Sequence, residues 1–105
     1  MSFKWPNKDP DETLDYSIDW SRFIDTATIS SARWYVDDAS SAKTLITAGS
    51  VVNGLQNVSQ TISNGVTTIY LGLGTVNTEY KIYCQITDNQ GLVAERVVRL
   101  RIKEQ

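Results

Sequence analysis

The sequence predicts an all-β fold, a two-layer β-sandwich of about seven short strands. Apolar and polar residues alternate along most of the chain, and turn-forming residues recur about every 8–12 residues. No segment has a helical period of useful length. This pattern is typical of an immunoglobulin-like sandwich, although a chain with one cysteine lacks the disulfide of antibody domains.

The clearest pattern lies in residues 78–102, which are predicted to form a β-hairpin. Every second residue of the first strand, from Tyr80 onward, is apolar. Residues 88–91 supply the turn, because Asp and Asn bond their own backbone and Gly tolerates positive φ. In the second strand Arg99 and Arg101 alternate with apolar residues, so both are expected to point away from the core.

The other elements are taken in chain order. Residues 1–11 contain both prolines, which fix φ and lack a ladder donor, so they are predicted to form an extended arm. The sandwich domain is assigned to residues 12–105. Its further strands are expected at 12–20, at 28–37, in short pieces within 45–55, at 58–62 and at 66–72, with a turn or bulge at 21–25 and an Asn-Gly hairpin turn at 64–65.

The core is predicted to lie between the two sheets and to contain five residues in particular: Trp34, Tyr80, Ile82, Cys84 and Leu100. Trp34 is the expected central aromatic. Cys84 lies on the apolar side of its strand, so it is interpreted as a small buried hydrophobe.

Composition argues against several classes of function. The chain has no histidine and a single cysteine, so histidine-based catalysis and a thiolate metal cage are not expected. Asp9, Asp11 and Glu12 lack the spacing and turn glycine of a calcium loop. We therefore predict no enzyme activity, no metal and no cofactor. A net charge of −2 gives no global attraction to nucleic acid or membrane, and without a signal-peptide pattern synthesis is expected in a cytoplasm.

Charge is unevenly distributed along the chain. Residues 1–40 hold eight acids against four bases, whereas the remainder holds six bases against four acids. The basic last strand, with Arg96, Arg99, Arg101 and Lys103, has three interpretations: an edge strand protected by charge, a seam with an acidic neighbour, or a nucleic-acid contact. The last of these lacks an exposed aromatic platform and is the least favoured.

Large aromatic residues on polar segments suggest contacts. Phe3 and Trp5 lie on the polar arm and are expected to pack on the domain's own flank or on a neighbouring subunit. Removing residues 1–11 is expected to spare the fold and prevent assembly. A different class of function, a carbohydrate-binding module, requires Trp5, Tyr35, Tyr70 and Tyr83 to form one exposed platform.

Three blocks of sequence resemble a group of small virion proteins of tailed bacteriophages. The first is Lys-Asp-Pro-Asp-Glu-x-Leu-Asp-Tyr at residues 8–16, completed by Asp19 and Trp20. The second is Thr-Ile-Ser-Ser-x-x-Trp at residues 28–34, and the third is the hairpin from Tyr80 to Gly91. This resemblance implies the same fold, no catalysis, and a structural role in the virion as a fibre–tail adaptor; a capsid decoration or cement protein remains the alternative.

The resemblance further implies that partners are other virion proteins of the tail, neck or fibre, with a homo-oligomeric ring expected and synthesis in the bacterial host cytoplasm. An acidic first strand and a basic last strand suit a contact in which one patch meets a different patch on the next copy. The predicted interface residues are Phe3, Trp5, Asp9, Asp11, Glu12, Asp15, Asp19, Arg99 and Arg101.

Overall fold

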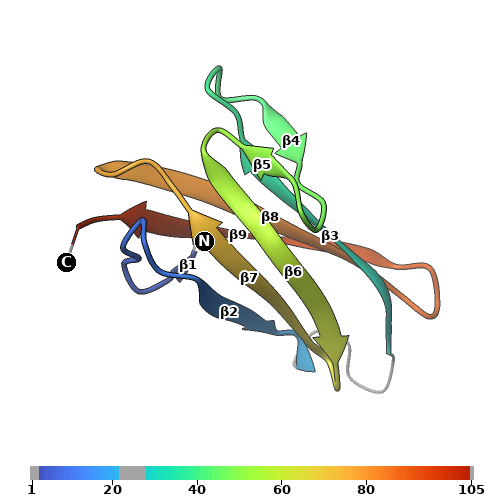
Figure 1. Cartoon of the computed structure of the whole chain (residues 1–105). Helices are drawn as coiled ribbons and strands as arrows, with labels where there is room; N and C mark the ends of the chain where they lie inside the picture. The colour runs from blue at the N-terminus through green and yellow to red at the C-terminus, as the bar shows by residue number, and fades with distance from the viewer. Residues whose placement is uncertain (1–2, 22–27, 105) are drawn as a thin grey trace.

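The computed structural model describes residues 3–21 and 28–104, and within them nine strands form two sheets that pack face to face (Figure 1). The strands are β1 (Phe3–Lys4), β2 (Leu14–Asp19), β3 (Ile29–Asp37), β4 (Lys43–Leu45), β5 (Val51–Val52), β6 (Leu55–Ser63), β7 (Val66–Leu73), β8 (Thr78–Asp88) and β9 (Val93–Ile102). The orders are β1-β9-β8-β3-β4 and β2-β7-β6-β5. The all-β sandwich predicted from the sequence is confirmed.

The two predicted hairpin turns are present and use the expected backbone chemistry. Asn64 and Gly65 both have positive φ, 50° and 77°, which matches the twist of a two-residue hairpin between β6 and β7. Between β8 and β9, the Asp88 carboxylate accepts hydrogen bonds from the backbone N–H groups of Gln90 and Leu92. Gly91 closes this turn with φ 84°.

The core lies between the sheets and contains all five residues predicted for it. Trp34 on β3 pairs in register with Cys84 on β8, and both are fully buried. At the start of β8 the Tyr80 hydroxyl donates to the Asn53 carbonyl at 2.7 Å and accepts from the Thr75 N–H at 2.9 Å. A tryptophan on the third strand and a tyrosine bonded to the preceding corner are features of immunoglobulin-like sandwiches.

The start of the chain differs from the sequence prediction. The arm is extended, but Phe3 and Lys4 form a short strand that pairs in parallel with Val98 and Arg99 of β9. A further parallel bridge joins Lys8 to Ile102. Two residues are too few to show an alternating pattern, so the sequence carried no signal for this strand. The predicted turn or bulge at 21–25 falls almost entirely outside the described residues.

Candidate functional site

The outer surface of the five-stranded sheet carries a group of basic side chains, which we call the basic face: Lys4, Arg33, Lys81, Arg99 and Arg101. Alternation along β8 and β9 sends Tyr80 and Leu100 into the core, so the intervening residues point outward. The register places Lys81 on one side of Arg99 and Lys4 on the other. Strand order therefore gathers bases that lie far apart in the sequence.

Arg99 has an acidic neighbour, but the contact is loose. Its Nη1 atom lies 4.0 Å from Oε1 of Glu79, and both side chains are more than a third exposed. An exposed ion pair of this kind contributes about 0–1 kcal/mol to stability. The guanidinium of Arg99 therefore retains most of its capacity to bind a carboxylate on a partner.

The opposite outer surface carries the acidic first strand. Asp15 and Asp19 on β2 are exposed, and Ser17 between them bonds to Thr68 on β7 at 2.8 Å between hydroxyl oxygens. No lysine or arginine occurs in β2, β5, β6 or β7. We call the surface formed by Asp15, Ser17, Asp19 and Thr68 the acidic face. The two faces lie on opposite sides of the sandwich.

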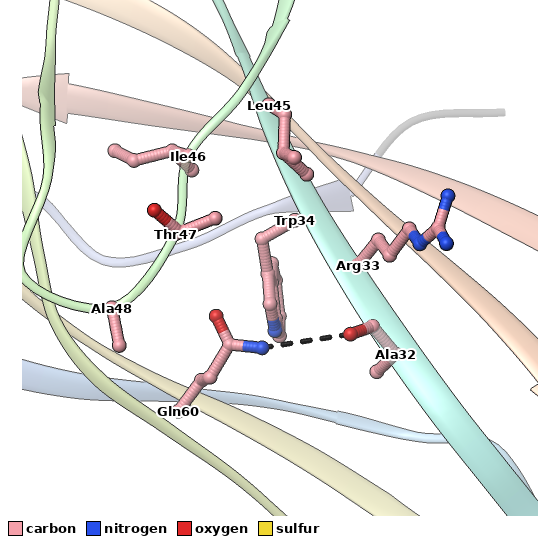
Figure 2. A pocket seen from close by; sticks show the side chains of 8 residues that line it. All are labelled: Ala32, Arg33, Trp34, Leu45, Ile46, Thr47, Ala48 and Gln60. Atoms are coloured by element: carbon pink, nitrogen blue, oxygen red, sulfur yellow. Dashed lines mark hydrogen bonds between the residues drawn. The ribbon is translucent and has the colours of Figure 1, made fainter.

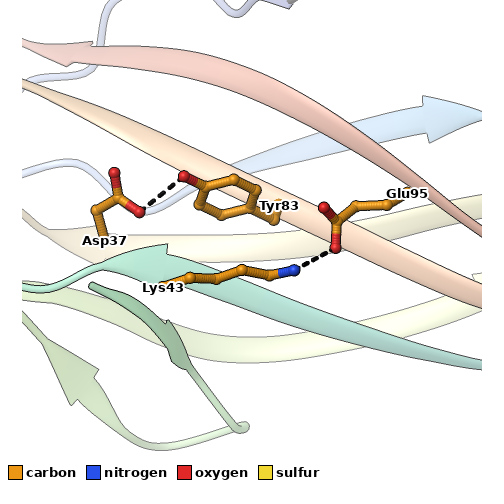
Figure 3. Close-up of polar contacts among 4 residues, drawn as sticks. All are labelled: Asp37, Lys43, Tyr83 and Glu95. Atoms are coloured by element: carbon orange, nitrogen blue, oxygen red, sulfur yellow. Dashed lines mark hydrogen bonds and ion pairs between the residues drawn. The ribbon is translucent and has the colours of Figure 1, made fainter. Parts of the chain in front are cut away.

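The side chain of Lys43 crosses the basic face from β4 toward β9 (Figure 3). Its ammonium lies 4.6 Å from the ring centre of Tyr35 and 5.3 Å from that of Tyr83, and it pairs with Glu95. The Tyr83 hydroxyl donates to Asp37 at 2.8 Å. Burial and this bond to a carboxylate raise the pKa of Tyr83 to about 12, so the phenol stays protonated at neutral pH.

Trp5 packs within its own domain. Its ring stacks on Tyr16 at 4.7 Å between centroids and lies 6.2 Å from Trp34. Its backbone N–H donates to the carbonyl of Arg99. The sequence left two possible packing sites for Trp5, the domain's own flank or a neighbouring subunit, and in the structure it packs on its own domain. The Phe3 side chain lies outside the described residues, so its role in an interface stays a prediction.

Lys8 is a residue that sequence reasoning missed, since it lies between two prolines in a polar segment with no apolar pattern. It is fully buried, and its ammonium donates to the carbonyls of Leu73 and Asp9 at 2.6 and 2.9 Å. Burial lowers the pKa of Lys8, while the nearby carboxylates of Glu12, Asp9 and Asp11 oppose that shift. Lys8 thus ties the arm to the corner that follows β7.

The acids that follow Lys8 form a compact turn. The backbone N–H of Asp9 donates to the carboxylate of Glu12, and the backbone N–H of Asp11 donates to the carboxylate of Asp9. A third bond runs from the N–H of Glu12 to the carbonyl of Asp9. These carboxylates therefore order their own turn and offset the charge of Lys8. Their predicted part in a partner interface stays a prediction.

The basic strand of the sequence analysis does not lie on one face. Arg99 and Arg101 point outward, but Arg96 pairs in register with buried Cys84 and belongs to the inner side. Its guanidinium lies 5.6 Å from the ring centre of Trp20, at the margin between the sheets. The outward positions predicted for Arg99 and Arg101 agree with the structure, whereas the position of Arg96 in the alternation is that of Val98 and Leu100.

The four aromatic residues proposed as a sugar platform do not share one surface. Tyr35 and Tyr83 are neighbours on the basic face, where Lys43 lies over both rings. Tyr70 is exposed on the other sheet, and Trp5 stacks on Tyr16. The arrangement gives no common plane on which one sugar chain can stack.

A protein-family model covers most of the chain. The model of a family described as podophage GP4 fiber-tail adaptor protein gp77 matches residues 8–101. The chain belongs to this family. The match runs from Lys8 to Arg101 and so includes β2 and nearly all of β9. It confirms the resemblance to a phage fibre–tail adaptor that the sequence motifs suggested. No curated protein matches the chain closely enough to be counted as a relative.

Two kinds of feature are absent from the described residues of this gp77-family chain. Among them no group of three or more acidic or cysteine side chains is placed to hold a metal ion. Within the same residues no helix has the length and apolar character needed to cross a bilayer.

Proposed function

We propose that the protein is a non-enzymatic virion component that joins the tail to its fibres, and that its copies associate head to tail in a ring. In this arrangement the basic face of one copy meets the acidic face of the next. The observation that carries the proposal is the placement of opposite charges on opposite outer surfaces of a chain that belongs to the gp77 family. Synthesis in the bacterial host cytoplasm, followed by incorporation into the particle, is part of the same proposal.

The geometry favours a contact between different patches over a contact between like patches. Two basic faces placed together would leave arginine beside arginine, which is repulsive. A basic face against an acidic face brings Arg99 and Arg101 toward carboxylates such as Asp15 and Asp19. A guanidinium that loses water there can bind a carboxylate with two parallel hydrogen bonds, which fixes orientation. Contacts of this kind form rings when the rotation between copies closes.

Arginine reversal tests the basic face directly. Arg99→Glu combined with Arg101→Glu is expected to leave the thermal midpoint of the isolated domain nearly unchanged, because both side chains reach solvent and the ion pair of Arg99 with Glu79 contributes little. Self-association measured by sedimentation velocity is expected to fall sharply, as is incorporation into particles measured by mass spectrometry. Association of the unmodified protein is expected to weaken as salt rises.

The matched control keeps the positive charge but replaces each planar guanidinium with an ammonium group. Arg99→Lys with Arg101→Lys is expected to retain most of the salt-sensitive attraction while losing the bidentate geometry, so its association lies between those of the unmodified and reversed chains. If the reversed chain assembles as well as the unmodified one, the basic face has no part in assembly. A solvated outer surface is then its remaining role, because β1 and the arm already cover the edge of β9 beside Arg99 and Arg101.

A further inference from the structure

One side of the sandwich is open. β4 pairs with β3 at residues 35–37, and β5 pairs with β6 at residues 55–56. Among the described residues no strand pairs with the rest of β3 or of β6 on that side. Backbone groups of an antiparallel strand point alternately to its two neighbours, and the Trp34 carbonyl accepts from Ile46 on this side. Ala32, two residues earlier, therefore presents its N–H and carbonyl to the open edge.

A recess of about 360 Å³ lies beside this edge (Figure 2). Leu45, Ile46 and Ala48 supply apolar lining, and Arg33 lines it from β3. Among the described residues, two polar atoms buried in this region have no hydrogen-bond partner: Nε1 of Trp34, a residue that lines the recess, and Oδ1 of Asn57, whose amide nitrogen bonds to the Ile46 carbonyl at 3.2 Å. An unpartnered buried donor and acceptor cost free energy, so a ligand that satisfies them gains affinity.

Gln60 already places one amide group in this region. It lies on β6 with its side chain on the inner side, since its strand partner Ile69 is buried. Its Nε2 donates to the Ala32 carbonyl at 3.5 Å, and its Oε1 accepts from the Asn57 amide at 2.8 Å. A primary amide has the donor and acceptor of a backbone peptide group. The long first bond shows that Gln60 fills this position only loosely.

We propose that this recess and the edge of β3 bind an extended peptide segment of a partner protein, which adds a strand beside Ala32 and displaces the Gln60 amide. The pattern of recognition is strand addition, in which backbone hydrogen bonds give affinity and alternate side chains enter pockets. The apolar lining selects small β-branched residues at alternate positions. Arg33, exposed at the rim, selects an acidic residue at one end of the segment. This site shares Arg33 with the basic face, but its other lining residues belong to neither charged face, and it goes beyond the adaptor function.

The test uses a short synthetic peptide of alternating valine and threonine with glutamate at one end, titrated into the isolated protein. Nuclear magnetic resonance is expected to show shifts of the Trp34 indole N–H and of the Ala32 amide, and the Ala32 amide is expected to exchange more slowly with solvent. The matched control peptide carries N-methyl groups on alternate backbone nitrogens. It cannot donate along one edge and is expected to cause neither change.

Variants of β6 provide the second part of the test. Gln60→Ala removes the competing amide and is expected to bind the peptide about two- to tenfold more tightly, the value of one net hydrogen bond. Thr61→Ala, on the next residue, whose partner Thr68 faces outward, is expected to leave the affinity unchanged. The proposal is overturned if peptide up to about 1 mM causes no shift at Trp34 and Ala32, or if the methylated peptide causes the same shifts.

Discussion

Trp34 fills the core and also lines the recess beside the edge of β3. Its ring is fully buried in the centre of the core, yet its indole N–H has no hydrogen-bond partner in the part of the chain that the structure describes. Trp34→Ala is expected to lower the free energy of unfolding by about 3–5 kcal/mol, through lost burial and the cavity that remains. Trp34→Phe keeps the aromatic packing and removes the unsatisfied donor, so a smaller loss is expected. Urea unfolding measures both. A loss under about 1 kcal/mol for the alanine variant contradicts a central role for Trp34.

The protonation of Lys8 is coupled to folding, because its ammonium is buried in the folded chain. Burial lowers the pKa of Lys8 below its ordinary value of 10.5, so at intermediate pH the unfolded chain holds this proton more firmly than the folded chain. The free energy of unfolding must therefore rise with pH between the lowered folded pKa and 10.5, as far as Lys8 contributes. The difference between the unmodified chain and a variant at Lys8 isolates this contribution from other groups.

Lys8→Met is the variant that tests this account. It leaves the carbonyls of Leu73 and Asp9 without the ammonium donor, and a loss of about 1–3 kcal/mol in unfolding free energy is expected at neutral pH. The stability gap between the two proteins is expected to widen as pH rises toward 10.5, because only the unmodified chain gains from deprotonation. Denaturant unfolding of both proteins across that pH range measures the gap. A gap that stays constant with pH would show that Lys8 does not cause the pH dependence of stability.

At the scale of elements, two glycines in turns offer a matched comparison. Gly74, after β7, has φ +108°, and a Cβ there would lie 2.8 Å from Ile102 Cδ1. Gly91, between β8 and β9, has φ +84° and open space around the same position. Gly91→Ala is expected to cost about 1–2 kcal/mol from backbone strain alone. Gly74→Ala is expected to cost about 1–3 kcal/mol more, because the side chain meets the core. Equal losses by urea unfolding contradict the clash.

The arm is an element of the fold, since it pairs with β9. Trp5 stacks on Tyr16, and Lys8 bonds across to Leu73, so removing residues 1–11 uncovers apolar surface and frees the edge of β9. The truncated chain is expected to fold, as the sequence predicts, but with a clearly lower thermal midpoint. Circular dichroism melts measure this. An unchanged midpoint would show that the arm adds little to stability.

The elements that sequence reasoning located are those with an alternating pattern and a recognisable turn. β8 alternates from Tyr80 onward and β9 alternates in its second half, and Asn64-Gly65 specifies its hairpin, so their positions could be read directly. The bond from Lys8 to Leu73 joins residues 65 apart, and the recess at Gln60 depends on where β4 and β5 stop pairing. Such features arise from tertiary contacts between segments that carry no local pattern.

At the scale of the whole molecule, the strand order places acidic and basic residues on opposite surfaces, whereas the sequence showed only that the first strand is acidic and the last strand basic. β2 and β9 belong to different sheets, so Asp15 and Asp19 face one way while Arg99 and Arg101 face the other. The periodicity predicted which side of each strand points outward. It did not predict that Lys4, Lys81 and Arg99 would lie in one row, because that requires β1 and β8 to flank β9.

A charge exchange within one chain tests the two faces together. Asp15→Arg with Asp19→Arg is expected to abolish head-to-tail association, as is Arg99→Glu with Arg101→Glu, since each pair places like charges across the contact. The chain that carries all four substitutions keeps the net charge of −2, because two acids become bases and two bases become acids. Its association is expected to recover, since each reversed face again meets its complement.

Sedimentation velocity at low and high salt measures the four proteins side by side. If association recovers in the fourfold variant and weakens with salt as it does in the unmodified chain, the basic face contacts the acidic face. Loss in both double variants without recovery shows that the faces contact different partners instead of one another. Because all four substitutions lie on outward positions of β2 and β9, the thermal midpoints are expected to stay close, which separates a loss of assembly from a loss of fold.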